Sequence, residues 1–183
     1  NREILMLLSM FHVSTPTLVY KHWLNGALKW LFDNPDPKAI DYKSYLENMA
    51  KAFLFDHYLS KAEPKDYYEI IYQNSSSCMI SSINEINESL LNQGEQVENF
   101  IFNYLDYLLW QDYNGEKKYV TGNDNRVKDF EYTFRSSVEH YYPQHPIQGK
   151  DCEIPKEWLH NFGNLCLLSS SKNAKLNNIM PAA

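Results

Sequence analysis

The stretch SVEHYYPQ at residues 137–144 and the stretch GNLCLLSSSKNAKLNNIMP at residues 163–181 decide the fold of the C-terminal part of the chain. Residues 135–140 predict a strand that ends before Pro143, because proline has no N–H group to donate to a neighbouring strand. Residues 163–168 predict a second, mostly apolar strand between a glycine and a serine cluster. The two strands together predict a hairpin.

A helix is expected directly after this hairpin. Ser170 or Ser171 can cap a helix that carries Lys172 and Asn173 in its first turn. If that helix crosses the hairpin, Asn173 can face the end of the first strand at residues 139–140. The expected unit is therefore strand, loop, strand and helix.

Four polar residues of this unit fit the hydrolysis of a phosphodiester. Magnesium prefers oxygen ligands and keeps several waters, so the Glu139 carboxylate and the Asn173 amide oxygen would suffice beside substrate phosphate. His140 can accept a proton near neutral pH and is the candidate general base. Asn164 is placed to hydrogen-bond across the hairpin and hold the loop that carries His140.

The strand pleat sets a condition on this site. Successive residues of a strand point to opposite faces, so Glu139 and His140 can share a site only where the strand bends or ends. Pro143, three residues after His140, favours such an end.

The pattern E-H-x-x-P-Q, then G-N-L-x-L-L, then S-x-x-N-x-x-L-x-N resembles the HNH (ββα-metal) nuclease domain at the C-terminal end of GmrSD-type modification-dependent restriction enzymes. It is also similar to the HNH domain of the CRISPR guide-RNA nuclease. The resemblance implies that Glu139 and Asn173 bind a divalent metal, magnesium or manganese, that His140 is the general base and that Asn164 is the middle Asn. The close similarity covers residues 130–181.

The chain departs from the resembled family at two points. Many HNH domains have Asp where Glu139 stands, which lengthens the ligand arm and keeps its charge. The nucleotide-hydrolysing N-terminal half of GmrSD-type proteins is not recognisable, and the chain opens without Met inside an expected helix at residues 2–11. We therefore expect a fragment that lacks an N-terminal nucleotide-hydrolysing domain or subunit. The resemblance alone implies that the substrate is DNA rather than RNA.

Each residue of the set also has an ordinary interpretation. His140 could be a core histidine among aromatic residues, Glu139 a surface charge, Asn164 a turn residue and Asn173 a helix-start residue. For the ordinary interpretation to hold, four unrelated residues would have to occur by chance in the order and spacing of a nuclease motif. This coincidence favours the interpretation as a nuclease. Two alternatives stay open: a non-catalytic helical interaction module with a degenerate hairpin, and an HNH toxin with an immunity partner.

Two further histidines lie close to the motif. His145 follows it and is interpreted as a solvated loop residue. His160 lies in an expected short helix at residues 155–161, which Gly163 ends, and is interpreted as structural or exposed.

The charge of the chain argues against a protein that coats DNA without specificity. The net charge is −6, and residues 131–183 hold five basic and five acidic residues, so the imbalance lies in the first 130 residues. Phosphate contacts are therefore expected from Lys172, Lys175 and Arg135, close to the proposed site.

The cysteines and the hydropathy of the sequence indicate the cellular compartment of the protein. Three cysteines without a C-x-x-C pair indicate neither a disulfide framework nor a structural zinc site. We find no signal peptide and no long apolar run, so a cytoplasmic protein without a membrane partner is expected.

The first part of the chain is expected to be helical. Residues 97–109 and 45–54 place apolar side chains at helical spacing, and residues 18–31 do so less regularly. The predicted fold is α+β: a bundle of five or six helices at residues 1–114, a connecting loop at residues 115–129, and a ββα-metal, HNH-like unit at residues 130–183.

Overall fold

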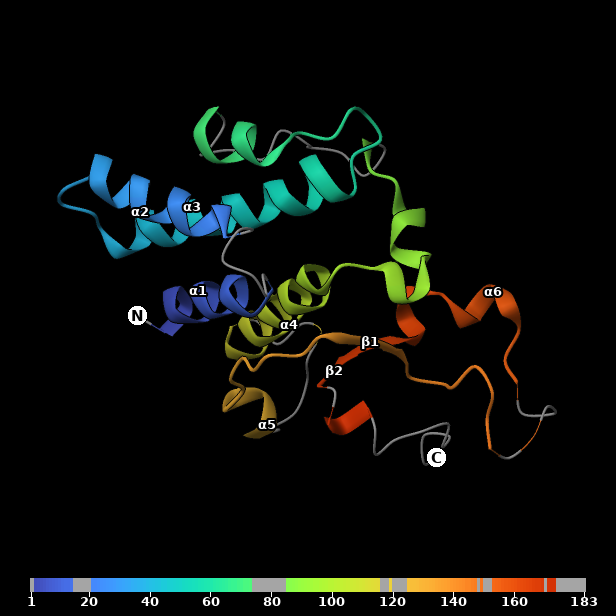
Figure 1. Cartoon of the computed structure of the whole chain (residues 1–183). Helices are drawn as coiled ribbons and strands as arrows, with labels where there is room; N and C mark the ends of the chain where they lie inside the picture. Colours follow the sequence, from blue (N-terminus) through green and yellow to red (C-terminus); the bar gives the residue numbers. More distant parts are fainter. Residues whose placement is uncertain are drawn as a thin grey trace. The chain divides into compact units, whose positions relative to one another are not determined.

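The computed structural model describes residues 2–14, 21–73, 85–115, 119, 125–147, 149, 153–169 and 171–173. Within these ranges the chain is mainly helical and contains a two-stranded antiparallel sheet, β1–β2 (Figure 1). The predicted combination of helices with a small hairpin is confirmed. None of the described helices is long and apolar enough to cross a membrane.

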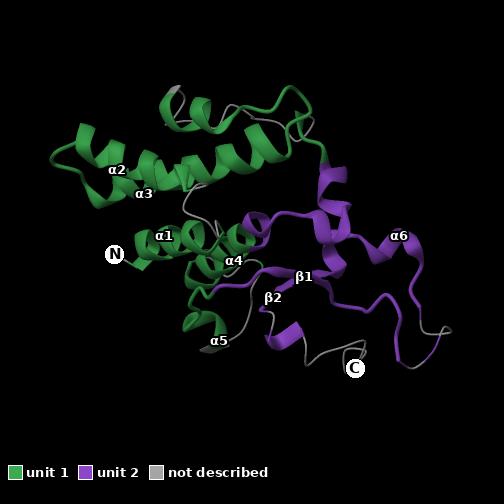
Figure 2. Cartoon of the chain, viewed as in Figure 1, with its two compact units in different colours: residues 1–87, 103–133 green, residues 88–102, 134–183 purple. Residues whose placement is uncertain are grey.

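The chain forms two compact units (Figure 2). Unit 1 comprises residues 1–87 and 103–133, and unit 2 comprises residues 88–102 and 134–183. The segment 88–102 therefore belongs with the hairpin, although some 30 residues of unit 1 separate them along the chain. Compact units are not independently folding domains, so the domain boundaries at residues 114 and 130 stay predictions.

Unit 1 is built from helices whose periodicity is visible in the sequence. Its described helices are α1 (Arg2–Ser14), α2 (His22–Asp33), α3 (Ala39–Ala52), two π-helical segments (Phe53–Tyr58 and Glu69–Gln73), the larger part of α4 (Asn99–Asn114) and α5 (Asn125–Lys128). The helical patterns at residues 45–54 and 97–109 are confirmed, and α5 adds a single turn within the segment expected to be a loop. The expected helix start at Thr15 lies outside the described residues.

The core of unit 1 is formed by the apolar faces of these helices. Leu7 and Met10 of α1 and Leu46 and Met49 of α3 are almost completely buried, and α1 packs on α3. Helices α2 and α3 lie side by side, joined by the break at residues 34–38 (Figure 1). Burial of apolar side chains is the main favourable contribution to the folding of such a helical unit.

Unit 2 contains the hairpin. Its described elements are two 3₁₀ turns (Glu88–Asn92 and Gly94–Gln96), the first turn of α4, β1 (Ser137–His140), α6 (Lys156–Leu159), a third 3₁₀ turn (Phe162–Asn164) and β2 (Leu165–Leu168). Residues 171–173 are again helical. The predicted order of strand, loop, strand and helical turn is therefore present.

The strands are shorter than predicted at their N-terminal ends. β1 begins at Ser137 instead of residue 135, and β2 begins at Leu165 instead of residue 163. The second difference has a local cause: the Asn161 side chain accepts a hydrogen bond from the Gly163 N–H at 2.9 Å and fixes a 3₁₀ turn over residues 162–164. The strand can start only after that turn.

The hairpin register divides the sheet into a buried and an open face. Val138 pairs with Leu167 and His140 with Leu165, while Glu139 pairs with Cys166. Val138, Leu165 and Leu167 are buried, so His140 shares their face and Glu139 lies on the other one.

Candidate functional site

The open face of the hairpin brings Glu139 and Asn173 into direct contact. The Asn173 amide Nδ2 donates a hydrogen bond to Glu139 Oε1 at 2.5 Å and lies 3.3 Å from Ser137 Oγ. The Ser137 hydroxyl also donates to the same carboxylate oxygen. Residues 34 positions apart in sequence are therefore joined at one point.

Asn173 reaches this point because a helical turn starts directly after β2. The carbonyl of Ser169 accepts hydrogen bonds from the N–H groups of Lys172 (2.9 Å) and Asn173 (3.0 Å). The first intrahelical bonds therefore start at the Ser169 carbonyl, and Ser170, one of the two residues expected to cap the helix, lies outside the described residues. Asn173 lies in the first turn, as predicted.

His140 ends β1 on the buried face. Its side chain is only 7% exposed, its Nε2 lies 3.1 Å from Nδ1 of His160, and its Nδ1 lies 3.8 Å from Oε1 of Glu95. Burial, together with the neighbouring His160, lowers the pKa of His140 below its ordinary value, although the carboxylates of Glu95 and Glu139 act in the opposite direction. A lowered pKa keeps the imidazole neutral at pH 7, which is the form that can accept a proton.

Asn164 holds the turn after β1. Its Oδ1 accepts a hydrogen bond from the Tyr142 N–H at 2.8 Å, and its Nδ2 donates to the carbonyls of Tyr142 (3.3 Å) and Leu159 (2.9 Å). Its own carbonyl accepts from the Tyr141 N–H at 2.7 Å. The amide thus bridges the hairpin to the residues that follow His140, in the geometry expected of a residue that orients rather than reacts.

The structure therefore places the four candidate residues in two adjacent groups. Glu139 and Asn173 meet on the open face, whereas His140 and the turn held by Asn164 lie at the end of the buried face. The charge of Glu139 acts on His140, so the two groups are within electrostatic reach. Glu139 and His140 both lie within β1, paired with Cys166 and Leu165, so no bend or strand end falls between them and their side chains stay on different faces of the sheet.

The three predicted phosphate-binding residues differ in accessibility. Lys172 is exposed beside Asn173 and is free to reach a phosphate. Arg135 is half-buried, two residues before β1. Lys175 lies outside the described residues. Of the two described residues, Lys172 is the more exposed.

The donor set on the open face fits a hard divalent cation better than zinc. The described residues contain no group of three or more His, Cys, Asp or Glu side chains that could hold a metal ion. Cys166 lies opposite Glu139, and burial with the nearby carboxylate raises the pKa of its thiol. One carboxylate and one amide oxygen, completed by water and phosphate oxygens, match the preference of magnesium.

Sequence reasoning missed the residues that surround His140. His160 was predicted to be structural or exposed; it is exposed, but it also contacts the candidate base. Its position five residues before Leu165, the partner of His140 across the hairpin, was the available signal. Glu95 had no such signal, because it lies 45 residues before His140 in sequence. His145 is exposed and faces Glu153 at 3.4 Å, which fits the predicted loop residue.

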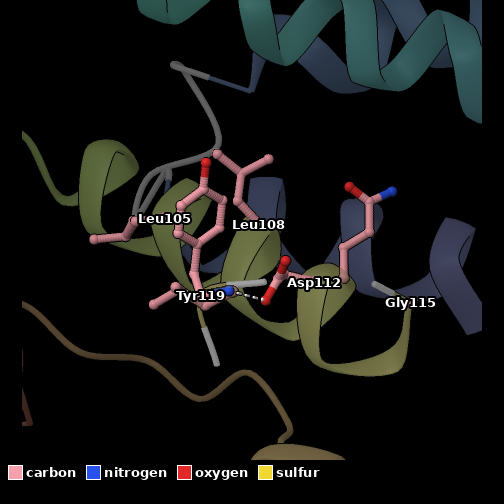
Figure 3. A pocket seen from close by; sticks show the side chains of 7 residues that line it. Leu105, Leu108, Asp112, Gly115 and Tyr119 are labelled. Atoms are coloured by element: carbon pink, nitrogen blue, oxygen red, sulfur yellow. Dashed lines mark hydrogen bonds between the residues drawn. The ribbon is translucent and has the colours of Figure 1, made fainter. Parts of the chain in front are cut away.

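A pocket of about 680 Å³ in unit 1 offers a different chemistry (Figure 3). It is lined by Leu105, Leu108, Leu109, Gln111, Asp112, Gly115 and Tyr119. Its carboxylate, that of Asp112, accepts a hydrogen bond from the Tyr119 N–H at 2.8 Å. The described lining residues include no histidine and no cation, so they lack the groups that phosphodiester hydrolysis needs.

Comparison with known protein families identifies the family of the C-terminal part of the chain. The family model of the GmrSD restriction endonuclease C-terminal domain matches residues 80–181, which is more than half of the chain. The match begins well before residue 130 and so includes the segment 88–102, which is part of unit 2. No curated protein and no solved structure matches the chain.

Proposed function

Because the chain belongs to the family of GmrSD restriction endonuclease C-terminal domains, we propose that it is a metal-dependent DNA endonuclease of the HNH type. The contact between Glu139 and Asn173 carries the proposal, since it joins a carboxylate and an amide beside a buried histidine at the end of one strand. The hairpin with the following helical turn would then be a ββα-metal unit. The same intact residue set argues against a degenerate, non-catalytic hairpin.

Each residue has a role that its contacts support. Glu139 and Asn173 would hold magnesium or manganese through oxygen atoms. When bound, such a cation stabilises negative charge on the scissile phosphate and the departing 3′ oxygen. His140 would take the proton from water as the water oxygen bonds to phosphorus and the bond to the 3′ oxygen breaks. Asn164 would keep the turn after His140 in place.

The charge distribution supports a need for further DNA contacts. Lys172 and Arg135, with Lys175, supply the cations closest in sequence to the site, whereas the first 130 residues carry the net charge of −6. A domain with this balance gains little affinity from non-specific phosphate contacts. We therefore propose that an N-terminal nucleotide-hydrolysing domain or subunit contributes DNA affinity, in a cytoplasmic restriction or phage-defence protein.

Plasmid cleavage tests the function. Supercoiled DNA is incubated with this chain, and in parallel with the full-length protein, in magnesium, in manganese and in excess EDTA. Nicked or linear DNA should form with either metal and disappear with EDTA. Cleavage that continues undiminished in excess chelator would rule out a one-metal site at Glu139 and Asn173.

Replacing Glu139 with Gln should raise the magnesium concentration needed for half-maximal cleavage by roughly tenfold or more, because a charged ligand is lost while the side-chain length is kept. A magnesium titration of the cleavage rate measures the effect. Glu157→Gln, an exposed position of α6, removes the same charge away from the contact and serves as the control. Equal metal requirements in both variants would contradict the assignment of Glu139.

A further inference from the structure

His140 is not the only histidine at the end of the hairpin. The rings of His140 and His160 have centroids 5.2 Å apart and are tilted by 58°, and the hydrogen bond between them joins Nε2 of His140 to Nδ1 of His160. The proposed function assigns no task to His160.

Three backbone contacts fix the segment that carries His160. The carbonyl of His160 accepts a hydrogen bond from the Gly94 N–H at 3.4 Å, and the carbonyl of Leu159 accepts one from the Asn164 amide. The Phe162 N–H donates to Asn92 Oδ1 at 3.0 Å. His160 is therefore exposed but tied both to the 3₁₀ turns at residues 88–96 and to the residue that holds the turn after His140.

The imidazole of His160 occupies the space that a side chain at residue 94 would need. Gly94 has a φ of +61°, and a Cβ atom at this position would lie 2.6 Å from Nδ1 of His160. Only glycine combines that backbone conformation with the space the ring occupies. The close approach of Gly94 thus leaves His160 little freedom around the nitrogen that faces His140.

The contact between the two rings can form with either nitrogen as the donor. If Nε2 of His140 carries the proton and donates to Nδ1 of His160, then Nδ1 of His140 holds the lone pair. That nitrogen faces Glu95 Oε1 at 3.8 Å, beyond hydrogen-bond distance but close enough to stabilise a positive charge on the ring. A histidine base needs one nitrogen fixed by a hydrogen bond and the other open to the proton it accepts.

We propose that His160 is a positioning residue of the nuclease site, which accepts a hydrogen bond from Nε2 of His140 and so leaves Nδ1 as the atom that takes the proton from water. Gly94 supports His160 in this task. The proposal rests on the proposed function, because it gives His160 a role only through the reaction of His140.

Cleavage kinetics of three His160 variants test the role. His160→Ala should lower kcat roughly tenfold and leave KM for DNA unchanged, because the lost group orients the base and does not contact the substrate. His160→Asn should recover most of kcat, since its amide lies where Nδ1 of histidine lies. His160→Gln, whose amide lies one bond further out, should not. Equal kcat in all three variants and the parent protein would overturn the proposal.

A matched pair of glycine variants tests whether Gly94 holds the His160 ring in place. Gly94→Ala should lower kcat as His160→Ala does, because the new methyl group displaces the ring. Gly149→Ala is the control, since Gly149 also has a positive φ, +112°, but a Cβ there meets no atom within 4 Å. The control should keep the parent kcat. An unchanged kcat in Gly94→Ala would contradict the supporting role.

A measurement independent of cleavage separates this proposal from the proposed function. The ¹⁵N chemical shifts of the His140 ring should show a single tautomer with the proton on Nε2 in the parent protein and a mixture in His160→Ala. If the tautomer differs between the two proteins as expected but the parent protein cuts no DNA, the proposed nuclease function is refuted and the contact between His160 and His140 stands. A parent protein that cuts DNA, with the same tautomer in both proteins, would refute the positioning role alone.

Discussion

Replacing His140 with alanine should lower the rate of plasmid cleavage about 100-fold or more, because the variant has no group in place to accept the proton of the attacking water. Metal and DNA binding should persist, since Glu139 and Asn173 contact each other on the opposite face of β1. Initial rates at saturating magnesium, together with DNA binding in a non-cleaving metal such as calcium, measure the two effects separately.

Loss of packing must be distinguished from loss of the base, because the His140 side chain is largely buried. Val138→Ala removes a buried side chain from the same face of β1 without removing an ionisable group. It should lower the melting temperature and retain cleavage at a temperature where it is folded. Full activity of His140→Ala would remove His140 as the base, and a Val138→Ala variant that is equally inactive while folded would attribute the loss to packing.

The hairpin could be predicted from the sequence because its signals are local. Pro143 and the serine cluster after Leu168 limit the strands, and the apolar run Leu165–Leu168 between turn residues favours a short buried strand. The strand starts could not be predicted as well, since the 3₁₀ turn at residues 162–164 depends on a side-chain hydrogen bond of Asn161. Local propensity does not reveal such a bond before the turn exists.

The role of the segment 88–102 could not be predicted, because its contacts are distant in sequence. The segment forms 3₁₀ turns at Glu88–Asn92 and Gly94–Gln96, and the second of these turns packs against β1. A contact between segments so far apart in sequence leaves no local pattern that could predict it.

The arrangement of Glu139 and His140 shows how a pleated strand can supply two different environments. Burial disfavours the charged form of His140, whereas the half-buried Glu139 on the other face accepts hydrogen bonds from Ser137 and Asn173. Consecutive residues can therefore serve as a neutral base and a charged ligand.

Asn164→Ala should cost roughly 1 to 3 kcal/mol of unfolding free energy, because it leaves part-buried backbone groups of Tyr142 and Leu159 without their hydrogen bonds. The three contacts of its amide, to Tyr142 twice and to Leu159 once, place it at the upper end of that range. Turnover should fall as the turn after His140 loosens, and added magnesium should not restore it. Urea unfolding and a magnesium titration of the rate measure both consequences.

Asn173→Ala should give the opposite pattern. Its amide contacts only side chains of β1 among the interactions the structure describes, so the melting temperature should change little. Activity should fall and recover in part at high magnesium, because a lost neutral ligand weakens metal binding without removing the charged one. Asn34→Ala, which removes one amide–carbonyl hydrogen bond at the end of α2, controls for the substitution itself.

The roles of Asn164 and Asn173 are thus distinguished by two measurements, the stability of each variant and the recovery of its activity by magnesium. A metal site predicts that magnesium rescues the variant at residue 173 and not the one at residue 164, while a purely structural pair predicts that both lose stability and neither is rescued. If added metal rescues Asn164→Ala and fails to rescue Asn173→Ala, the ligand lies in the turn after β1 rather than on the open face. The Glu139–Asn173 contact would then be a hairpin-to-helix brace, and the base and the metal would have to share the buried end of the strand.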